Sequence, residues 1–405
     1  MTKKLRIFVG SESFPRPDIA AGDKRLFSMI EIMSRRHDVT LFVNSPLLGS
    51  CDLDRYIQQL EYAGTRRIER GFWRMNRVMA RYDFDLAIFE FFQCEGSLGK
   101  EFRRSQPGVP VLVDSVDLHY VREAKRAELH AVPAEVLGKN KAREIQAYER
   151  ADGVVMVTPE DDLALKTELP AVRTWLVPII CPIVTRPQLL RDRELLFIGG
   201  FQHLPNVDGM LWFTGEIWPL IRQQFPDAKL TIVGSNAPEQ ILALEKISGI
   251  IVVGYVPETA PYLERASVSI APLRFGAGMK GKVTEALAAA VPIVTTSFGA
   301  QGFSAIDGEH LLVADDPTGF ANHAIRLLKF PELAESIGRN GQNLVKRICS
   351  PEVVADQLEC MLQEAASMRR SSVFLGQRTL YRASEFASLS SRIASRVFRS
   401  LIPRT

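Results

Sequence analysis

The sequence predicts an α/β protein built from two Rossmann-like domains that face each other across a cleft. Three observations lead to this prediction. Short apolar runs of β type alternate with helical stretches, the alternation occurs in two successive series, and a proline-rich segment separates the two series. Such alternation is typical of right-handed βαβ crossovers, so each series predicts one parallel sheet covered by helices.

The expected strands fall at regular intervals along the chain. In the first series they cover residues 5–9, 39–43, 86–91, 109–113, 154–157 and 175–177. In the second series they cover residues 195–198, 230–233, 250–253, 268–271, 293–296 and 311–313. Ligands bind beyond the carboxyl ends of the strands in open parallel sheets, so the residues that follow each run are the informative ones.

The domain boundary is expected within residues 178–194, where three prolines are followed by charged residues. We therefore assign residues 1–185 to an N-terminal Rossmann-like domain and residues 186–350 to a C-terminal one. Residues 351–370 are expected to form a C-terminal helix, for which a return to the N-terminal domain is one arrangement. Residues 371–405 form a basic tail that is either amphipathic or disordered.

Composition and charge exclude some classes of protein. With 46% hydrophobic and 24% charged residues, the chain is typical of soluble globular proteins. The net charge is +3, but from Met368 to the end eight arginines face one glutamate, a surplus of +7 that leaves −4 for the remainder. The body of the chain is therefore not expected to bind nucleic acid, and an anionic surface would meet the tail.

The five cysteines are widely spaced and form no CxxC pair, which favours a reducing compartment. No apolar run reaches the roughly 18 residues that a membrane-spanning helix needs. The apolar part of the amino terminus is too short for a signal peptide and leads directly into the first expected strand. We therefore expect a cytoplasmic protein, with peripheral attachment to the inner face of the membrane as an option.

Two arginine-rich stretches have the composition of helices that lie on anionic membranes. Residues 66–81 interleave six arginines with large apolar side chains. For this stretch a helix packed on its own domain is the favoured interpretation. The tail places apolar side chains among arginines at roughly helical spacing, and for it a disordered extension is the alternative.

In the first domain, the position of each polar cluster relative to its strand distinguishes candidates for a ligand site from residues with a structural role. Asp83 and Asp85 spell a DxD motif but precede their strand, so a structural or solvated role is expected for them. Residues 10–13 follow the first strand and residues 21–23 lead into the first helix, so both segments can face a cleft. Glu90 ends a strand at the ligand edge, beside aromatic residues that either contact a second substrate or belong to the core.

A polar cluster follows the fourth expected strand at the same edge. Asp114, Asp117 and His119 lie close together in the sequence there, and arginines follow on a helix. A histidine beside carboxylates is a candidate acid–base group. A surface histidine that borders a loop is the equally weighted alternative.

The second domain carries two glycine-containing loops directly after expected strands. Gly199 and Gly200 end one strand, and Asn206 lies in the turn into the next helix. Tyr255 and Val256 follow another strand, where backbone groups can cradle a flat base. We expect both loops to face the first domain.

The most informative stretch is residues 268–299, which reads as strand, glycine-rich turn, helix and strand. Three glycines allow the turn to approach a ligand closely, and they are Gly276, Gly278 and Gly281. Lys280 and Lys282 lie at the expected helix start, whose N–H groups favour a di-anion such as a nucleotide diphosphate. Glu285, one turn later, can accept hydrogen bonds from both hydroxyls of a ribose. An ordinary βαβ unit with solvated lysines is the alternative.

Taken together, four segments resemble the nucleotide-sugar domain of glycosyltransferases with the GT-B fold, specifically the family 4 retaining enzymes (glycosyl transferases group 1). The segments are residues 199–209 and the stretches LTIVGS, VVGYVPE and GAGMKGKVTEALAAAVPIVTT. The resemblance covers about residues 190–350 strongly. It covers the first half more weakly, through the opening SESFPRPDIAAGDKRLF and the stretch VDSVDLHYVREAKRAEL.

The resemblance implies transfer of a sugar with retention from a nucleotide diphosphate sugar, without a metal or other cofactor. The acceptor, a glycan, a lipid-linked intermediate or a small molecule, would bind mainly to the N-terminal domain. Glu285 would hold the ribose, and Gly278 and Met279 would offer backbone N–H groups to the sugar and phosphates. Lys280 and Lys282 would offset the diphosphate charge.

The chain departs from the family pattern at three places. The first glutamate of the family's pair, eight residues before Glu285, falls at Ala277. Gln202 and His203 stand where the first donor loop usually has Arg and Lys, so Lys280 or Lys282 is expected to substitute in space. On the acceptor side the usual His-Asp pair reads Val-Asp, and His119 is the nearest histidine.

Two other functions stay open at this point. A non-catalytic module that binds nucleotide sugars is consistent with Ala277 and with the altered first loop. A sugar-nucleotide epimerase shares the two-domain architecture, but the expected cleft offers few acidic and histidine candidates for its double proton transfer.

Overall fold

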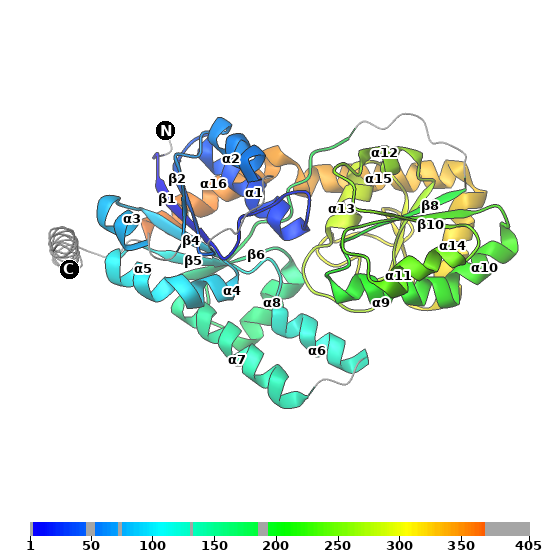
Figure 1. The fold of residues 1–405 in the computed structure, drawn as a ribbon, viewed down its shortest axis with the longest axis horizontal. Helices are drawn as coiled ribbons and strands as arrows, with labels where there is room; N and C mark the ends of the chain where they lie inside the picture. Colours follow the sequence, from blue (N-terminus) through cyan, green and yellow to red (C-terminus); the bar gives the residue numbers. More distant parts are fainter. Residues whose placement is uncertain (1–2, 46–52, 72–74, 130–132, 185–192, 369–405) are drawn as a thin grey trace, which may run out of the picture.

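The computed structural model describes residues 3–45, 53–71, 75–129, 133–184 and 193–368, which form two α/β domains side by side (Figure 1). Each domain contains one parallel sheet whose strands are separated in sequence by helices. The predicted fold class, two Rossmann-like domains, is therefore confirmed.

Within the described residues, the first sheet has seven strands in the order β3-β2-β1-β4-β5-β6-β7. The strands are β1 (Arg6–Ser11), β2 (Asp38–Val43), β3 (Arg67–Arg70), β4 (Leu86–Glu90), β5 (Val111–Asp114), β6 (Gly153–Met156) and β7 (Thr174–Leu176). The central strands are buried on both faces, as expected for a parallel sheet covered by helices.

The second sheet has six strands in the described residues, in the order β10-β9-β8-β11-β12-β13. They are β8 (Glu194–Ile198), β9 (Lys229–Val233), β10 (Ile250–Gly254), β11 (Val268–Ala271), β12 (Ile293–Thr295) and β13 (Leu312–Val313). In each sheet the order reverses beside the first strand of the domain, and ligand sites form at such switch points.

Helices cover both faces of each sheet. In the first domain they are α1 (Ala21–Ser34), α2 (Leu53–Tyr62), α3 (Met75–Arg81), α4 (Phe91–Cys94), η2 (Glu95–Gly99), α5 (Lys100–Ser105), α6 (His119–Leu129), α7 (Ala134–Arg150) and α8 (Pro159–Glu168). In the second they are α9 (Leu204–Trp212), η3 (Phe213–Ile217), α10 (Trp218–Gln224), α11 (Glu239–Leu242), η4 (Ala243–Lys246), α12 (Ala260–Arg265), α13 (Gly281–Ala288), α14 (Pro317–Lys329) and α15 (Pro331–Cys349).

Helix α16 (Pro351–Ser367) follows the second domain in sequence but packs on the first. Its apolar face joins the core beneath β1 and α1, and Glu359 accepts a 2.9 Å contact from His37. The chain thus crosses between the domains twice. The two crossings touch, because the Cys181 N–H donates to the Cys349 carbonyl at 2.8 Å.

The arginine-rich stretch 66–81 is not one helix, so that interpretation is wrong. Residues Arg67–Arg70 form the edge strand β3, and only Met75–Arg81 form a helix. Ile68 packs against the core, whereas the Arg67 guanidinium stacks 3.7 Å from the Tyr82 ring centroid. Charged side chains on an edge strand discourage pairing with other chains. The aromatic residues of this stretch lie outside the described residues, as does the tail.

The contacts of the buried Asp85 agree with a structural role for the DxD motif. Asp85 accepts hydrogen bonds from the Arg6 side chain and backbone N–H, all at 3.0 Å, at the opposite end of β4 from the cleft.

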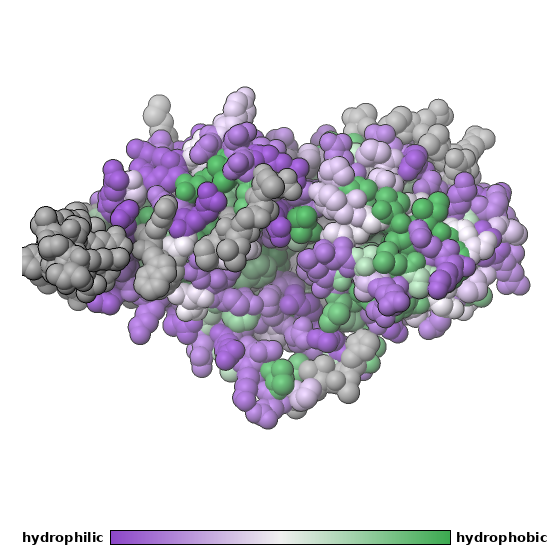
Figure 2. All heavy atoms as spheres, viewed as in Figure 1, coloured by the Kyte–Doolittle hydropathy of each residue, from purple (hydrophilic) through white to green (hydrophobic). Residues whose placement is uncertain are grey.

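In the face shown in Figure 2, hydrophilic residues predominate on the first domain and the surface is recessed between the domains. None of the helices in the described part of the chain is both long and apolar enough to span a bilayer.

Candidate functional site

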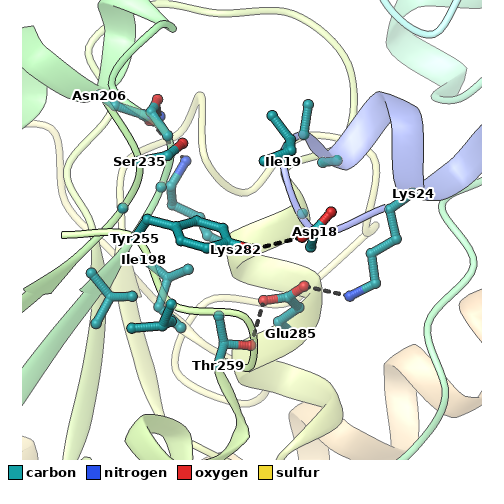
Figure 3. A pocket seen from close by; sticks show the side chains of 18 of the residues that line it. Asp18, Ile19, Lys24, Ile198, Asn206, Ser235, Tyr255, Thr259, Lys282 and Glu285 are labelled. Carbon is teal, nitrogen blue, oxygen red and sulfur yellow. Dashed lines mark hydrogen bonds and ion pairs between the residues drawn. The ribbon is translucent and has the colours of Figure 1, made fainter. Parts of the chain in front are cut away.

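A cavity lies between the two domains, at the carboxyl ends of their strands (Figure 3). The space among its lining residues amounts to about 790 Å³, which includes solvent on its open side. One wall is the loop between β1 and α1. The other consists of the segments that follow β8, β9 and β10, together with the start of α13.

The structure brings many of the predicted binding residues together in this cavity. Those that line it are Gly199, Gly200, Asn206, Tyr255, Val256, Lys282 and Glu285. The first domain contributes residues 17–21 and Lys24 to the opposite wall. Gly276, Gly278, Met279, Lys280 and His119 lie outside the lining.

Two helices begin at the cavity, one from each domain. Helix α13 starts at Gly281 and α1 at Ala21. A Cβ at position 281 would lie only 2.7 Å from the Ala21 Cβ, so the two helix starts are adjacent and glycine is required for the fit. Helix starts carry roughly half a positive charge on N–H groups that have no acceptor within the helix. Their meeting point therefore favours an anion.

Lys282 is the second-domain cation of the cavity. Its Nζ donates a 2.9 Å hydrogen bond to Asn206 Oδ1, and Asn206 in turn donates to the Gly200 carbonyl at 2.6 Å. Burial, reinforced by the neighbouring charge of Lys280, lowers the pKa of Lys282 to about 8. Of the two lysines predicted to substitute for the missing basic residues of the first loop, Lys282 is the one that reaches this loop.

Glu285 lies one turn into α13 and links the two domains. Its Oε1 accepts a 2.6 Å hydrogen bond from Lys24 Nζ, and its Oε2 accepts one from Thr259 at 3.4 Å (Figure 3). Burial acts to lower the pKa of Lys24, but the Glu285 carboxylate outweighs it and raises that pKa. The carboxylate is therefore fixed at the cavity floor by partners on both sides.

A second interdomain contact closes the cavity beside this pair. The Tyr255 hydroxyl donates to Asp18 Oδ2 at 2.6 Å, and Arg55 donates to the same oxygen at 2.8 Å. Tyr255 thus combines a partly exposed ring with a fixed hydroxyl. Such a ring can stack against a flat ligand at the cavity mouth.

The glycine turn is held by the first domain rather than left open. Gly278 has a positive φ of 68°, and its N–H donates to Asp161 Oδ2 in α8 at 3.0 Å. The Lys280 ammonium folds back onto the carbonyls of Gly278 and Ala277. Burial lowers the pKa of Lys280 to about 8 and raises that of Asp161 to about 6. Lys280 therefore stabilises the turn and balances nearby carboxylates instead of facing the cavity.

The rest of the turn is packed in the interface. Gly276 has a positive φ of 154°. Met279 is buried, and its Sδ accepts a contact from Cys349 Sγ at 3.7 Å, which links the turn to the end of α15. These two residues shape the turn in the structure. Their predicted contacts with a ligand stay predictions.

His119 lies at the start of α6, on the first-domain side of the cleft. Its Nε2 is 3.2 Å from Asp117 Oδ1, and its Nδ1 is 3.3 Å from Gln93 Nε2. The imidazole also packs against the rings of Phe91 and Phe92. This arrangement orients the ring, but His119 is not part of the cavity lining.

A buried carboxylate lies deeper in the first domain, at the end of β4. Glu90 Oε2 accepts a 2.5 Å hydrogen bond from the Ser11 hydroxyl, and burial raises the pKa of Glu90 to about 8. The neighbouring Phe91 and Val116 both have positive φ, which is rare for such residues and often accompanies functional loops. Sequence reasoning placed Glu90 at this edge but gave no sign of the strained backbone.

Sequence reasoning missed two first-domain residues that contact the second domain, Lys24 and Asp161. Lys24 lies one residue beyond the segment 21–23 that was expected to face the cleft. A lysine in the first turn of a helix that follows a strand was the available signal. Asp161, also in the first turn of its helix, lies among several acidic residues, and no local pattern distinguishes it.

Two facing Rossmann-like domains with a cavity between them define the GT-B class of glycosyltransferase folds. Sucrose-phosphate synthase from Thermosynechococcus elongatus matches 89% of this chain and 99% of its own, with a TM-score of 0.68 at 16% identity. HepE from Anabaena, solved with UDP-glucose, matches 89% of this chain and all of its own (100%), with a TM-score of 0.67 at 12% identity. S. aureus TarM, solved with fondaparinux, alpha-GlcNAc-glycerol and UDP, matches 88% of this chain and 99% of its own, with a TM-score of 0.67 at 11% identity.

Within this class, residues 192–329 match the family described as "Glycosyl transferases group 1". The resemblance predicted from the sequence is thereby confirmed for the second domain. The "Uncharacterized 44.6 kDa protein in cps region" of Klebsiella pneumoniae is 30% identical over 167 residues, which are 38% of this chain and 43% of that protein. The aligned part thus spans less than half of that relative.

Proposed function

We propose that the protein is a retaining glycosyltransferase that transfers a sugar from a nucleoside diphosphate sugar to an acceptor. The observation that carries this proposal is the convergence of Lys282, Glu285 and the start of α13 in one interdomain cavity. The family match over residues 192–329 supports it. So do the ligands bound in the HepE and TarM structures, UDP-glucose and UDP.

We propose one orientation for the donor in the cavity. The diphosphate would lie at the start of α13, beside the Lys282 ammonium, because both favour negative charge. The ribose hydroxyls would donate to Glu285, one turn further along the helix. The base would then lie against Tyr255 and Val256 at the end of β10.

The chemistry follows from this placement. The bond between the anomeric carbon and the diphosphate oxygen breaks, and the acceptor oxygen forms the new bond on the same face of the sugar. The acceptor proton passes to the departing diphosphate. Lys282 and the helix start would stabilise the charge that develops on this leaving group, which is the largest contribution a preorganised site makes. We infer a mechanism without a metal, in which these groups supply the positive charge.

For the acceptor we propose a glycan or a lipid-linked intermediate of cell-envelope glycan synthesis. The relative from Klebsiella pneumoniae, a protein in the cps region, supports this class. Retention is tested separately, by determining the anomeric configuration of the product by NMR. A product with the configuration opposite to that of the donor would contradict the retaining mechanism.

Nucleoside diphosphate is expected to stabilise the protein against unfolding. Ligand at about 100 times its dissociation constant adds roughly 2.7 kcal/mol to the free energy of unfolding. Thermal unfolding with UDP, GDP and ADP in turn checks this prediction and identifies the preferred base. If the melting temperature does not change with any of the three, the donor-site assignment is wrong.

The affinity for nucleoside diphosphate is expected to fall at alkaline pH. The pKa of Lys282 is lowered to about 8 in the empty protein, and a bound diphosphate favours its charged form, so binding requires proton uptake above that pH. Affinity should be nearly constant from pH 7 to 7.5 and about tenfold weaker at pH 9. Titration calorimetry at each pH checks this. An unchanged dissociation constant up to pH 9.5 would remove Lys282 from the site.

One specific observation favours a second candidate, a non-catalytic module that binds nucleotide sugars. The Gly278 N–H is occupied by Asp161, and Ala277 provides no carboxylate for a sugar. Binding without turnover would identify this alternative.

A further inference from the structure

Lys24 is the second cation of the cavity, and it belongs to the domain opposite Lys282. Among the described residues that line the cavity, Lys24 and Lys282 are the ones with a lysine or arginine side chain. The Lys24 ammonium lies 2.6 Å from Glu285 Oε1, across the gap between α1 and α13 (Figure 3). The side chain keeps 36% of its surface exposed. A flexible lysine with this exposure can move while its helix stays in place.

A bound nucleoside would compete for the group that Lys24 contacts. On the proposed function, on which this inference rests, the ribose hydroxyls donate to the Glu285 carboxylate. In the structure, Lys24 and Thr259 each donate to one of its two oxygens. The ribose hydroxyls would share these oxygens with both donors, which weakens the attraction of Glu285 for the Lys24 ammonium.

The charge of the cavity indicates where the displaced ammonium would go. Two carboxylates, Asp18 and Glu285, and two lysines line the cavity, so its formal charges cancel. A diphosphate ester adds two negative charges, which Lys282 alone cannot balance. Helix α1 carries Lys24 in its first turn, and its start at Ala21 abuts Gly281, where the diphosphate would bind.

We propose that Lys24 is a diphosphate-binding residue, and that donor binding transfers its ammonium from the Glu285 carboxylate to the phosphates. The ion pair with Glu285 holds the lysine at the cavity. Because Lys24 comes from the first domain, full affinity for the diphosphate requires both domains. The phosphate group is thus recognised by one cation from each domain.

The test compares each nucleoside with its own diphosphate, so that the effect on phosphate binding is separated from the effect on Glu285. Dissociation constants are measured for uridine and UDP, or for the nucleoside and diphosphate of whichever base binds the full-length parent protein best. Lys24→Met is expected to reduce the preference for diphosphate over nucleoside by about tenfold or more, with nucleoside affinity unchanged or increased. Lys24→Arg should keep most of the preference.

Lys166→Met is the matched control, because it removes a first-domain lysine that also pairs with a carboxylate, Asp162 at 2.8 Å, but lies outside the cavity lining. Its preference for diphosphate should equal that of the parent. An unchanged preference in Lys24→Met, with thermal unfolding showing a folded protein, would overturn the role of Lys24 and leave the proposed function intact. A parent protein without any preference for diphosphate would overturn both.

Discussion

Replacement of Lys282 by methionine is expected to weaken nucleoside diphosphate binding by about 30- to 700-fold, which corresponds to about 2–4 kcal/mol. The ammonium lies beside Asn206 at the start of α13, so its loss removes the charge aimed at the phosphates. Titration calorimetry with the preferred nucleoside diphosphate measures the effect. Lys346→Met, at an exposed lysine of α15, is the matched control and should bind as the parent does.

The stability of the Lys282 variant separates loss of function from loss of fold. Burial lowers the pKa of Lys282 to about 8, so below that pH the folded protein holds a charge that the unfolded chain accommodates more easily. Methionine removes this cost, and the variant is expected to be at least as stable as the parent at pH 7. A variant that binds normally would show that the diphosphate lies elsewhere.

Replacement of Arg25 by methionine is expected to lower the free energy of unfolding of the first domain by about 3–5 kcal/mol. Arg25 and Asp114 are 1% and 0% exposed, and Arg25 Nη1 lies 2.5 Å from Asp114 Oδ2. The same guanidinium donates to the Val177 carbonyl at 2.8 and 3.3 Å. Its removal leaves a buried carboxylate and a buried carbonyl without these partners. Urea unfolding measures the loss.

A second substitution tests the physical reason for that loss. Combining Arg25→Met with Asp114→Leu removes the unpaired charge as well, and apolar replacement of a buried ion pair is often close to neutral. The double variant is therefore expected to recover most of the stability. If it is as unstable as the single variant, the loss comes from packing rather than from the isolated carboxylate.

The sequence was sufficient to predict the two sheets, because each strand is a local feature. Apolar β-type runs bounded by polar turns predict a buried parallel strand wherever they occur, and all twelve expected runs correspond to strands of the described structure. Among the described strands, β3 was not expected; it is an edge strand whose residues are mostly charged. An edge strand contributes little to the core, so its apolar signal was too weak to distinguish it from a basic helix.

The second-domain half of the cavity could also be predicted, because glycines after strands mark the ligand edge. The choice between Lys280 and Lys282 could not. These residues are two positions apart at a helix start, so they point in different directions, and a shift of one residue in the helix start would exchange them. The structure directs Lys282 to the cavity and Lys280 to the turn carbonyls.

The first-domain half of the cavity depends on contacts between residues that are far apart in the chain. Lys24 and Glu285 are separated by 261 positions, and Asp161 and Gly278 by 117. No local pattern encodes such pairs, since they form only when the two domains are placed against each other. The residues that couple the domains were therefore visible only in the structure.

The central claim is that the interdomain cavity binds a nucleotide sugar and activates it for transfer. The most direct test is to incubate the parent protein with UDP, GDP and ADP sugars and to measure release of nucleoside diphosphate by slow hydrolysis or transfer. We predict release from at least one donor by the parent, reduced at least about 30-fold in Lys282→Met and also in Glu285→Ala. Binding of nucleoside diphosphate without release from any donor would contradict the claim that the protein is a glycosyltransferase.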